Sequence, residues 1–469
     1  MSVIAPKFRL AYFLKSIIDN IFWIIILVTL IAIPAIQIVL FYMDLPVIEG
    51  ELLTAFLAFT WLFHPDMAIP LVKSLIHSDL FRIAAFPGFG FAALIAAGTI
   101  FVERKMLAKL QLRVGPFYCG KVEGILQLAA DGLKLISKEI IIPAKADKPI
   151  FWVAPILFVG TAAAFVSLIP VAPGGWVVAD LDVGLIAVFA VIGFFPIITI
   201  LSAWSANSKY PFIGGIRALH QMVSFEIPLI LSLLGVVILT GTLNLNEIVE
   251  SQASFPWIIF MPIGAIVFFT AMLAELERIP FDLPEAESEI VAGWLTEFSG
   301  MMYGLVQLGS YVKLFAFAAL FVTIFLGGWT GPVIWPPLDE QIITEGLPIS
   351  DFKGDPLLTV STPGLPLFDE DPNEWILQKH GLLEYTSGQL FFSGVIWFVL
   401  KTVVVIFFIL LPRGVFPRIR IDMLLHIGWY KLIGLAFVNI FIALGLLYAG
   451  VLGPEGIFYW AQQQELSKH

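Results

Sequence analysis

Long apolar runs separated by short polar segments dominate this chain. A helix needs about 20 apolar residues to span the hydrocarbon core of a membrane. About nine runs have this character, near 21–43, 86–104, 151–170, 183–203, 224–241, 256–274, 301–327, 391–411 and 430–450. The runs are continuous rather than alternating, which favours helices over barrel strands. The pattern predicts an all-α polytopic membrane protein with about nine transmembrane helices plus amphipathic surface helices.

Composition agrees with this class. Of 469 residues, 59% are hydrophobic and 13% are charged, which lies outside the range of soluble domains. No small-residue cleavage site follows the first run, so we expect a retained span rather than a signal peptide.

Loop charges predict the orientation. Lys and Arg concentrate before the first run and in 104–149 and 412–428, whereas 171–182 and 242–255 contain neither. With nine spans every basic segment falls on one side, which the positive-inside tendency assigns to the cytoplasm. We therefore expect a multi-pass protein of the cell inner (cytoplasmic) membrane with a cytoplasmic N-terminus. The net charge of −10 does not contradict this, because much of the acid lies in 328–390, assigned to the outer face, and the tendency counts Lys and Arg rather than net charge.

The chain divides into three parts. Residues 1–80 form an N-terminal extension with one extra span and an interfacial segment, 81–450 form the membrane domain, and 451–469 form a tail. Within the membrane domain, 121–137 has the spacing of an amphipathic helix on the cytoplasmic surface. The segment 328–390 is rich in Pro, Gly and acid and predicts a long irregular outer loop. The lack of an internal repeat weighs against inverted-repeat transporters.

Ligands for redox cofactors are scarce. Cys119 is the only cysteine and the six histidines are scattered, so we expect no iron–sulfur cluster, no haem and no metal site. A glycine fingerprint for nucleotides is also missing. Any redox chemistry therefore needs electrons delivered by another subunit.

Residues 273–300 hold the densest group of acids. The acids are Glu275, Glu277, Asp282, Glu285, Glu287, Glu289 and Glu297, around the single cation Arg278. Pro280 and Pro284 break the helix there, and after them we expect Glu285 and Glu289 on one helical face with Glu287 pointing away. A solvated acidic loop is the simpler interpretation. Clustered carboxylates, however, raise one another's pKa and suit proton uptake.

Other charged residues lie in or beside apolar runs. Glu226 either caps a helix or carries protons inside a span. Glu103 and Glu139 could each pair with a nearby Lys or Arg. Lys401 lies midway along a span, where it either reaches the interface or has an internal partner.

Residues 204–221 join two spans on the inner side. Asn207, Gly214-Gly215 and Arg217 are typical of a tight loop that makes specific contacts, and the alternative is a plain connector.

Seven motifs now form a recognisable set. They are ERKxLAxxQxRxGP at 103–116, LQxxADxxKLxxKE at 126–139, WSxNSKY at 204–210, GxxRxxxQMxSxE at 214–226, LAExxRxPFDLPEAESExVAG at 273–293, EFSGM at 297–301 and PRxRxD at 417–422. The chain thereby resembles the H-subunit family of respiratory complex I over about residues 86–445. Subunits of F420 dehydrogenases and membrane-bound hydrogenases share the pattern.

The resemblance implies a role in a multisubunit oxidoreductase. In this family the H subunit forms the membrane part of a quinone tunnel and couples quinone reduction to proton translocation, and it has no catalytic residue of its own. The implied tunnel residues are Gln111, Arg113, Lys134, Arg217, Arg278, Phe281 and Asp282. The implied proton-coupling residues are Glu103, Glu139, Glu226, Glu275, Glu285, Glu287, Glu289 and Glu297.

The resemblance also implies the partners. These are soluble iron–sulfur and quinone-site subunits on the cytoplasmic side, other membrane subunits, quinone as substrate and lipid, with no nucleic acid. Ser310 stands where complex I often has an acid, which keeps open an F420H2 dehydrogenase or energy-converting hydrogenase. A stand-alone ion transporter is the third interpretation.

Overall fold

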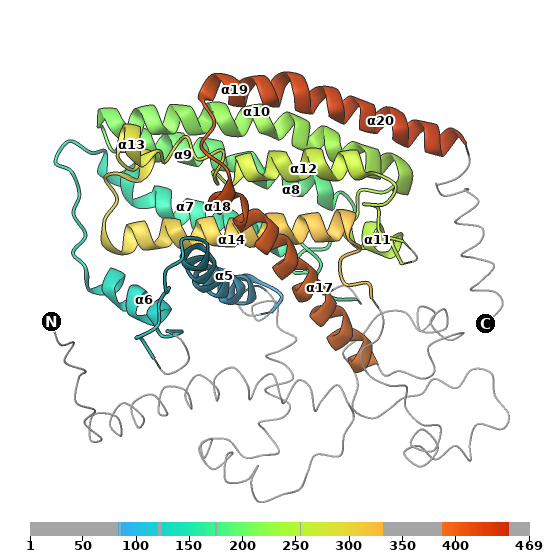
Figure 1. Cartoon of the computed structure of the whole chain (residues 1–469), viewed down its shortest axis with the longest axis horizontal. Coiled ribbons are helices and arrows are strands. Elements are labelled where there is room, and N and C mark those ends of the chain that lie inside the picture. The colour runs from blue at the N-terminus through green and yellow to red at the C-terminus, as the bar shows by residue number, and fades with distance from the viewer. Residues whose placement is uncertain are drawn as a thin grey trace, which may run out of the picture.

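The computed structural model describes residues 83, 86–120, 124–173, 176–253, 255–331 and 387–449. Their regular elements are helical, which confirms the all-α class (Figure 1). The expected first span, the interfacial segment at 44–80, most of the loop at 328–390 and the tail at 451–469 lie outside the described residues.

The other eight apolar runs all form helices. The elements are α5 (Phe89–Leu110), α6 (Gln127–Ser137), α7 (Lys148–Ser167), α8 (Gly184–Ile192), α9 (Phe194–Ser205), α10 (Lys209–Thr240), α11 (Leu245–Glu250), α12 (Pro262–Glu275), α13 (Glu287–Ile290), η2 (Gly293–Leu295), α14 (Gly300–Phe325), α17 (Ser387–Leu410), α18 (Pro412–Val415), α19 (Ile421–His426), η5 (Ile427–Leu432) and α20 (Ile433–Tyr448). Within the described residues, six stretches are long and apolar enough to cross a membrane: Lys148–Ser167, Gly184–Ser205, Lys209–Thr240, Gly300–Phe325, Ser393–Gly414 and Ile421–Tyr448. The apolar helix α12 is shorter.

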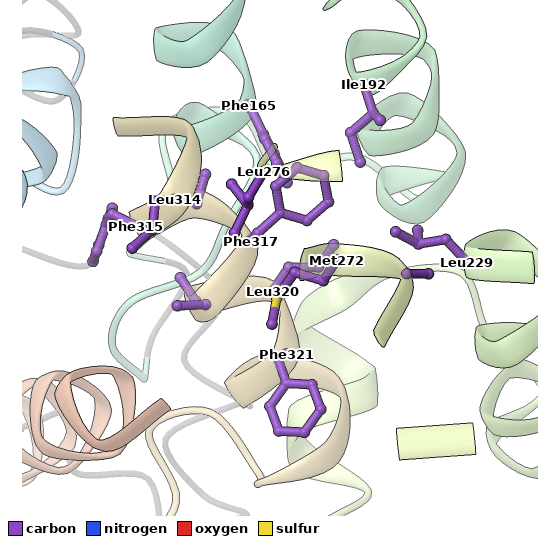
Figure 2. Packing of buried hydrophobic residues seen from close by; sticks show 14 of the residues in the cluster. Phe165, Ile192, Leu229, Met272, Leu276, Leu314, Phe315, Phe317, Leu320 and Phe321 are labelled. Carbon is purple, nitrogen blue, oxygen red and sulfur yellow. The ribbon is translucent and has the colours of Figure 1, made fainter. Parts of the chain in front are cut away.

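Helix α14 forms the centre of the bundle. It packs against α7, α5, α17 and α12, and most of its side chains are buried. Gly309 permits the close approach of α7, because a Cβ there would lie 2.7 Å from the ring of Phe158. Phe165 and Phe317 pack edge to face across the same contact, with ring centroids 5.0 Å apart. Figure 2 shows the aromatic and aliphatic side chains that fill this core.

Helices α10, α12 and α20 form a second packed group along one side of α14 (Figure 1). Asn439 of α20 is buried where the three helices meet, and its amide donates to the carbonyl of Ser232 at 3.1 Å. Gly235 and Gly264 make room for that amide.

Polar segments distant in sequence converge at one end of the bundle, which we call the polar end. Asn207 donates to the carbonyl of Lys145 at 2.9 Å, and the backbone amide of Ile141 donates to Ser299 at 2.8 Å. The backbone of Ile419 in turn bonds Pro280. Thus 104–149, 205–209, 275–299 and 412–428, the segments assigned to one side of the membrane, lie together.

The segments that the sequence assigns to the other side of the membrane meet at the opposite end. The backbone amide of Leu185 bonds the carbonyl of Leu243, and Gln252 donates to the carbonyl of Thr323 at 2.9 Å. Lys401 donates to three backbone carbonyls, those of Leu326, Gly328 and Thr330. The internal-partner interpretation of Lys401 is therefore correct.

The expected tight loop at 204–221 is wrong, because α10 already begins at Lys209. The two glycines serve helix packing rather than a turn. A Cβ on Gly214 would lie 2.7 Å from the backbone of Gly293, and one on Gly215 would lie 2.3 Å from the side chain of Ala203. The same extension corrects the capping interpretation of Glu226, which lies inside α10 and far from its first turn.

Candidate functional site

A buried carboxylate, Glu103, collects partners from three other segments at the polar end. It lies near the end of α5 with 2% of its surface exposed. Arg278 donates to its Oε1 at 2.9 Å, Tyr311 of α14 donates to its Oε2 at 2.8 Å, and Arg413 of α18 pairs with it as well. The Arg278 guanidinium also stacks on the Tyr311 ring, 4.7 Å from its centroid. We call these four residues the Glu103 cluster.

Two guanidinium groups against one carboxylate give the Glu103 cluster a positive excess. A buried carboxylate needs such partners, because burial of an unpaired charge is costly. The contacts connect α5, residues 273–300 (which we call the acidic segment), α14 and α18. A change of charge here therefore acts on four elements at once.

A second buried ion pair lies close by. Lys313 of α14 donates to the backbone carbonyl of Glu275 at 2.8 Å and lies 3.3 Å from its Oε2. The exposed fractions of the two side chains are 4% and 0%. The charge of Lys313 also acts on Glu226 and Glu277. We call Lys313, Glu275, Glu277 and Glu226 the Lys313 cluster.

The Lys313 cluster has the opposite charge balance, with one cation facing three carboxylates. One oxygen of Glu275 and one of Glu277 are shielded from solvent and lack a hydrogen-bond partner. Burial, reinforced by the neighbouring Glu285, raises the pKa of Glu277 to about 8, against an ordinary 4.5. Such a group can hold a proton near neutral pH and release it when the local charge changes.

Lys313 is a functional candidate that the sequence reasoning missed. The signal was present, since a Lys inside an apolar span is expensive unless it has an internal partner. The same signal marks Lys401, which the sequence pattern did single out.

The acidic segment is held in place by Gln221 of α10. Its amide donates to the carbonyls of Ala274 and Phe281, each at 2.7 Å. Phe281 is buried and packs on Phe225 of α10, with ring centroids 5.5 Å apart. These bonds fix the turn that leads from α12 through Arg278.

Cations from outside this segment also pair with its acids. Arg418 bonds Asp282 at 3.1 Å, and Arg217 bonds Glu289 at 2.6 Å. Burial raises the pKa of Asp282 above its ordinary value, and Arg418 opposes the shift. Arg278, which is the only basic residue of this segment in the sequence, is therefore not its only cation in the fold.

The expected helical face of Glu285 and Glu289 is wrong. Helix α13 begins at Glu287, so Glu285 precedes it. Glu285 instead lies close enough to Glu277 and Arg278 for their charges to interact. The side chain of Glu287 lies outside the described residues.

The remaining expected site residues lie on the surface. Gln111 and Arg113 are exposed and bond each other at 2.7 Å. Lys134 on α6 is exposed, as is Glu139. Glu297 is partly exposed, and neither it nor Glu139 forms an ion pair within the described residues. The structure thus separates these five from the two buried clusters.

A narrow hollow, too tight to admit a water molecule, lies between α5, the segment after it and α6. It is lined by Ile100, Phe101, Arg104, Pro116, Gln127 and Leu128. Asp131 of α6 pairs with Arg104 and accepts from Gln127, which fastens α6 beside this hollow. In the described ranges, no three His, Cys, Asp or Glu side chains gather as metal ligands would.

Comparison with known proteins places these residues in a family. The sequence profile described as NADH dehydrogenase matches residues 84–444. The chain is 40% identical over 363 residues to the H subunit of NADH-quinone oxidoreductase from Geobacillus sp. (strain WCH70), covering 77% of this chain and 90% of the relative. The H subunit from Dehalococcoides mccartyi is 37% identical over 76% of this chain and 83% of its own, and that from Bacillus cytotoxicus 38% over 79% and 97%. The chain therefore belongs to the NADH dehydrogenase family, among relatives named as H subunits of NADH-quinone oxidoreductases.

Proposed function

We propose that this chain is the H-type membrane subunit of a proton-translocating NADH:quinone oxidoreductase. It contributes a quinone passage and a set of coupled charges, while partner subunits deliver the electrons. The relatives' names and the extent of the matched region support this assignment. The polar end then faces the cytoplasm, in agreement with its basic loops.

The observation that carries the coupling role is the series of buried and half-buried ionisable groups from Glu103 to Glu226. The Glu103 cluster and the Lys313 cluster are linked through the acidic segment, where Glu285 interacts electrostatically with both Glu277 and Arg278. Ionisable groups inside a membrane domain are costly and are kept mainly for function. Two-electron reduction of a quinone nearby changes the charge at low dielectric, to which buried carboxylates respond strongly.

We assign the quinone passage to the side of the bundle formed by α5 and α6, which must separate to admit a quinone because the hollow between them is too narrow for a water molecule. An apolar tail needs an apolar path that opens to lipid, and Ile100, Phe101 and Leu128 supply such a lining. The exposed polar groups Gln111, Arg113 and Lys134 lie on the adjoining segments, from which they can reach a headgroup or the subunit that binds it.

The surface of the polar end suits docking of peripheral subunits. Leu112 is 96% exposed, Val114 78% and Tyr118 97%. Large apolar side chains gathered on one surface, with basic neighbours, are typical of a protein interface. We therefore assign the soluble partners to this surface and the other membrane subunits to the apolar flanks of the bundle.

Purification from the native membrane in a mild detergent tests the assignment. We expect this chain to co-purify with iron–sulfur and quinone-site subunits, and the complex to oxidise NADH with quinone as acceptor. Activity with F420H2 but not NADH would assign it to the related dehydrogenases instead. Recovery of the chain alone, with ion transport but no oxidoreductase partners, would contradict the proposal.

A further inference from the structure

Lys313 lies in the middle of the buried charges but is not one of their carboxylates. It comes from α14, the most buried long helix of the described residues, and its ammonium meets Glu275 at the end of α12. The Phe195 ring of α9 covers it, with the centroid 4.3 Å from Nζ, and Phe317 lies on the next turn. Aromatic faces stabilise a cation without neutralising it.

Three neighbouring elements place an acidic side chain near Lys313. Glu275 ends α12, Glu277 follows it in the acidic segment, and Glu226 belongs to α10. On the α5 side, Glu103 is already taken by Arg278 and Arg413. Within the described residues, Lys313 is thus the cation that bonds the carboxylate of Glu275.

The backbone contact is as important as the ion pair. The shorter of the two bonds, at 2.8 Å, runs to the Glu275 carbonyl, while the carboxylate lies at 3.3 Å. Lys313 is therefore anchored on the backbone of α12, and its pairing with the carboxylate is the looser contact. The other oxygen of Glu275 has no partner, so this carboxyl group has room in its bonding to take up a proton.

We propose, on the basis of the proposed proton-coupling function, that Lys313 is a positioning residue that favours the ionised form of Glu275 and so sets when this carboxyl group takes up a proton as the charge at the quinone site changes. Its fixed positive charge, rather than a proton of its own, is what the cluster needs. It places a cation about one helical turn after Ser310, at the start of the buried stretch of α14 that begins at Val312. The carboxylates Glu226 and Glu277 then compete for the proton that Glu275 does not hold.

Three substitutions separate charge from structure. Lys313→Met removes both the charge and the donor, Lys313→Gln keeps a donor for the Glu275 carbonyl without the charge, and Lys313→Arg keeps the charge. Lys401→Met is the matched control, because it removes a second Lys of the membrane helices, one that is partly buried and whose ammonium bonds only backbone carbonyls in the described residues. All are measured in the assembled complex, normalised to subunit content.

The readouts are proton translocation per electron and the pH profile of quinone reduction. Without the charge of Lys313, the carboxyl group of Glu275 holds its proton to higher pH. The acidic limb of the pH–activity profile should therefore shift to higher pH by about one to three units. We expect this shift, with reduced translocation, in the Met and Gln variants. The Arg variant should behave as wild type, and Lys401→Met should leave the limb in place.

Each outcome decides the matter. Wild-type profile and translocation in an assembled Met or Gln variant overturn the proposal, as does lost translocation in an assembled Arg variant. If neither Lys313→Met nor Lys313→Gln assembles, the Lys313→Arg complex tests the proposal by itself. Retained proton translocation in that complex supports the proposal. A wild-type complex that reduces quinone without moving protons would instead refute the proposed function.

Discussion

Arg278 donates a hydrogen bond of 2.9 Å to Glu103, a carboxylate that precedes it by 175 residues. The cation of the acidic segment is thereby bound to the end of α5, and Arg413 holds the same carboxylate from α18. Two acids that follow Arg278 in the chain pair with other cations: Asp282 pairs with Arg418, and Glu289 pairs with Arg217. This arrangement connects the acidic segment to the helix that borders the α5–α6 hollow.

Arg278→Ala leaves Glu103 with one guanidinium. Removal of one partner of a buried pair costs about 3–5 kcal/mol, and we expect the lower part of that range because Arg413 remains. Quinone reduction and proton uptake should fall together, while Arg278→Lys should lose less because the charge is kept. Both rates are measured per assembled complex. Wild-type turnover in a fully assembled Arg278→Ala complex would mean that the pair is not part of coupling.

Gln221→Leu tests how the acidic segment is held. The substitution leaves the carbonyls of Ala274 and Phe281 without their buried donor, at a cost of about 1–3 kcal/mol. Amide hydrogen exchange between residues 274 and 284 should become faster. Gln252→Leu is the control, since it removes a similar buried amide at the opposite end. Unchanged exchange at 274–284 in Gln221→Leu would show that other contacts hold the segment.

Glu277 predicts a pH dependence of stability. Its pKa of about 8 in the fold exceeds the ordinary 4.5, so the folded state binds the extra proton between these values. Stability from this group is therefore full below about pH 4.5 and is lost as pH rises through 8. Glu277→Gln should be more stable than wild type at pH 9 and similar at pH 5, in thermal unfolding of the purified complex. Equal melting temperatures at pH 9 would contradict this.

The sidedness of the two ends can be tested by labelling. With Cys119 replaced by Ser, Asp182→Cys and Asn207→Cys place single thiols at exposed positions of opposite ends. An impermeant reagent should label residue 182 from outside, and residue 207 only in inverted vesicles. A third thiol at Asp369, in the segment outside the described residues, should behave like residue 182. Labelling of residue 207 from outside would reverse the predicted orientation.

The helices, and six of the expected spans, were predictable from sequence because burial in lipid demands long apolar runs. All eight runs within the described residues form helices, and the breaks at Pro280 and Pro284 were also expected. Helix starts were less predictable. Gly214-Gly215 looked like a turn, but the close contacts with Gly293 and Ala203 show that interhelical packing selected the glycines.

Pairing between distant residues could not be derived from one sequence. Glu103, Arg278 and Arg413 were each visible as charged positions, but their meeting depends on how α5, α14 and α18 pack. Lys313 is hard to recognise from sequence because it lies inside a long apolar run. A charged residue in such a run is nevertheless informative, because it needs an internal partner. Local periodicity also placed Glu285 on a helix that begins only at Glu287.

Proton translocation by a Glu275→Gln complex tests the central claim most directly. The amide keeps an acceptor for Lys313 but cannot exchange a proton, so the chain of buried charges is interrupted at its most buried carboxyl group. The assembled complex is reconstituted in vesicles, and protons moved per electron are compared with wild type and with Glu247→Gln, an acid at the opposite end. We predict that Glu275→Gln abolishes translocation while Glu247→Gln does not. Full translocation by an assembled Glu275→Gln complex would contradict the account.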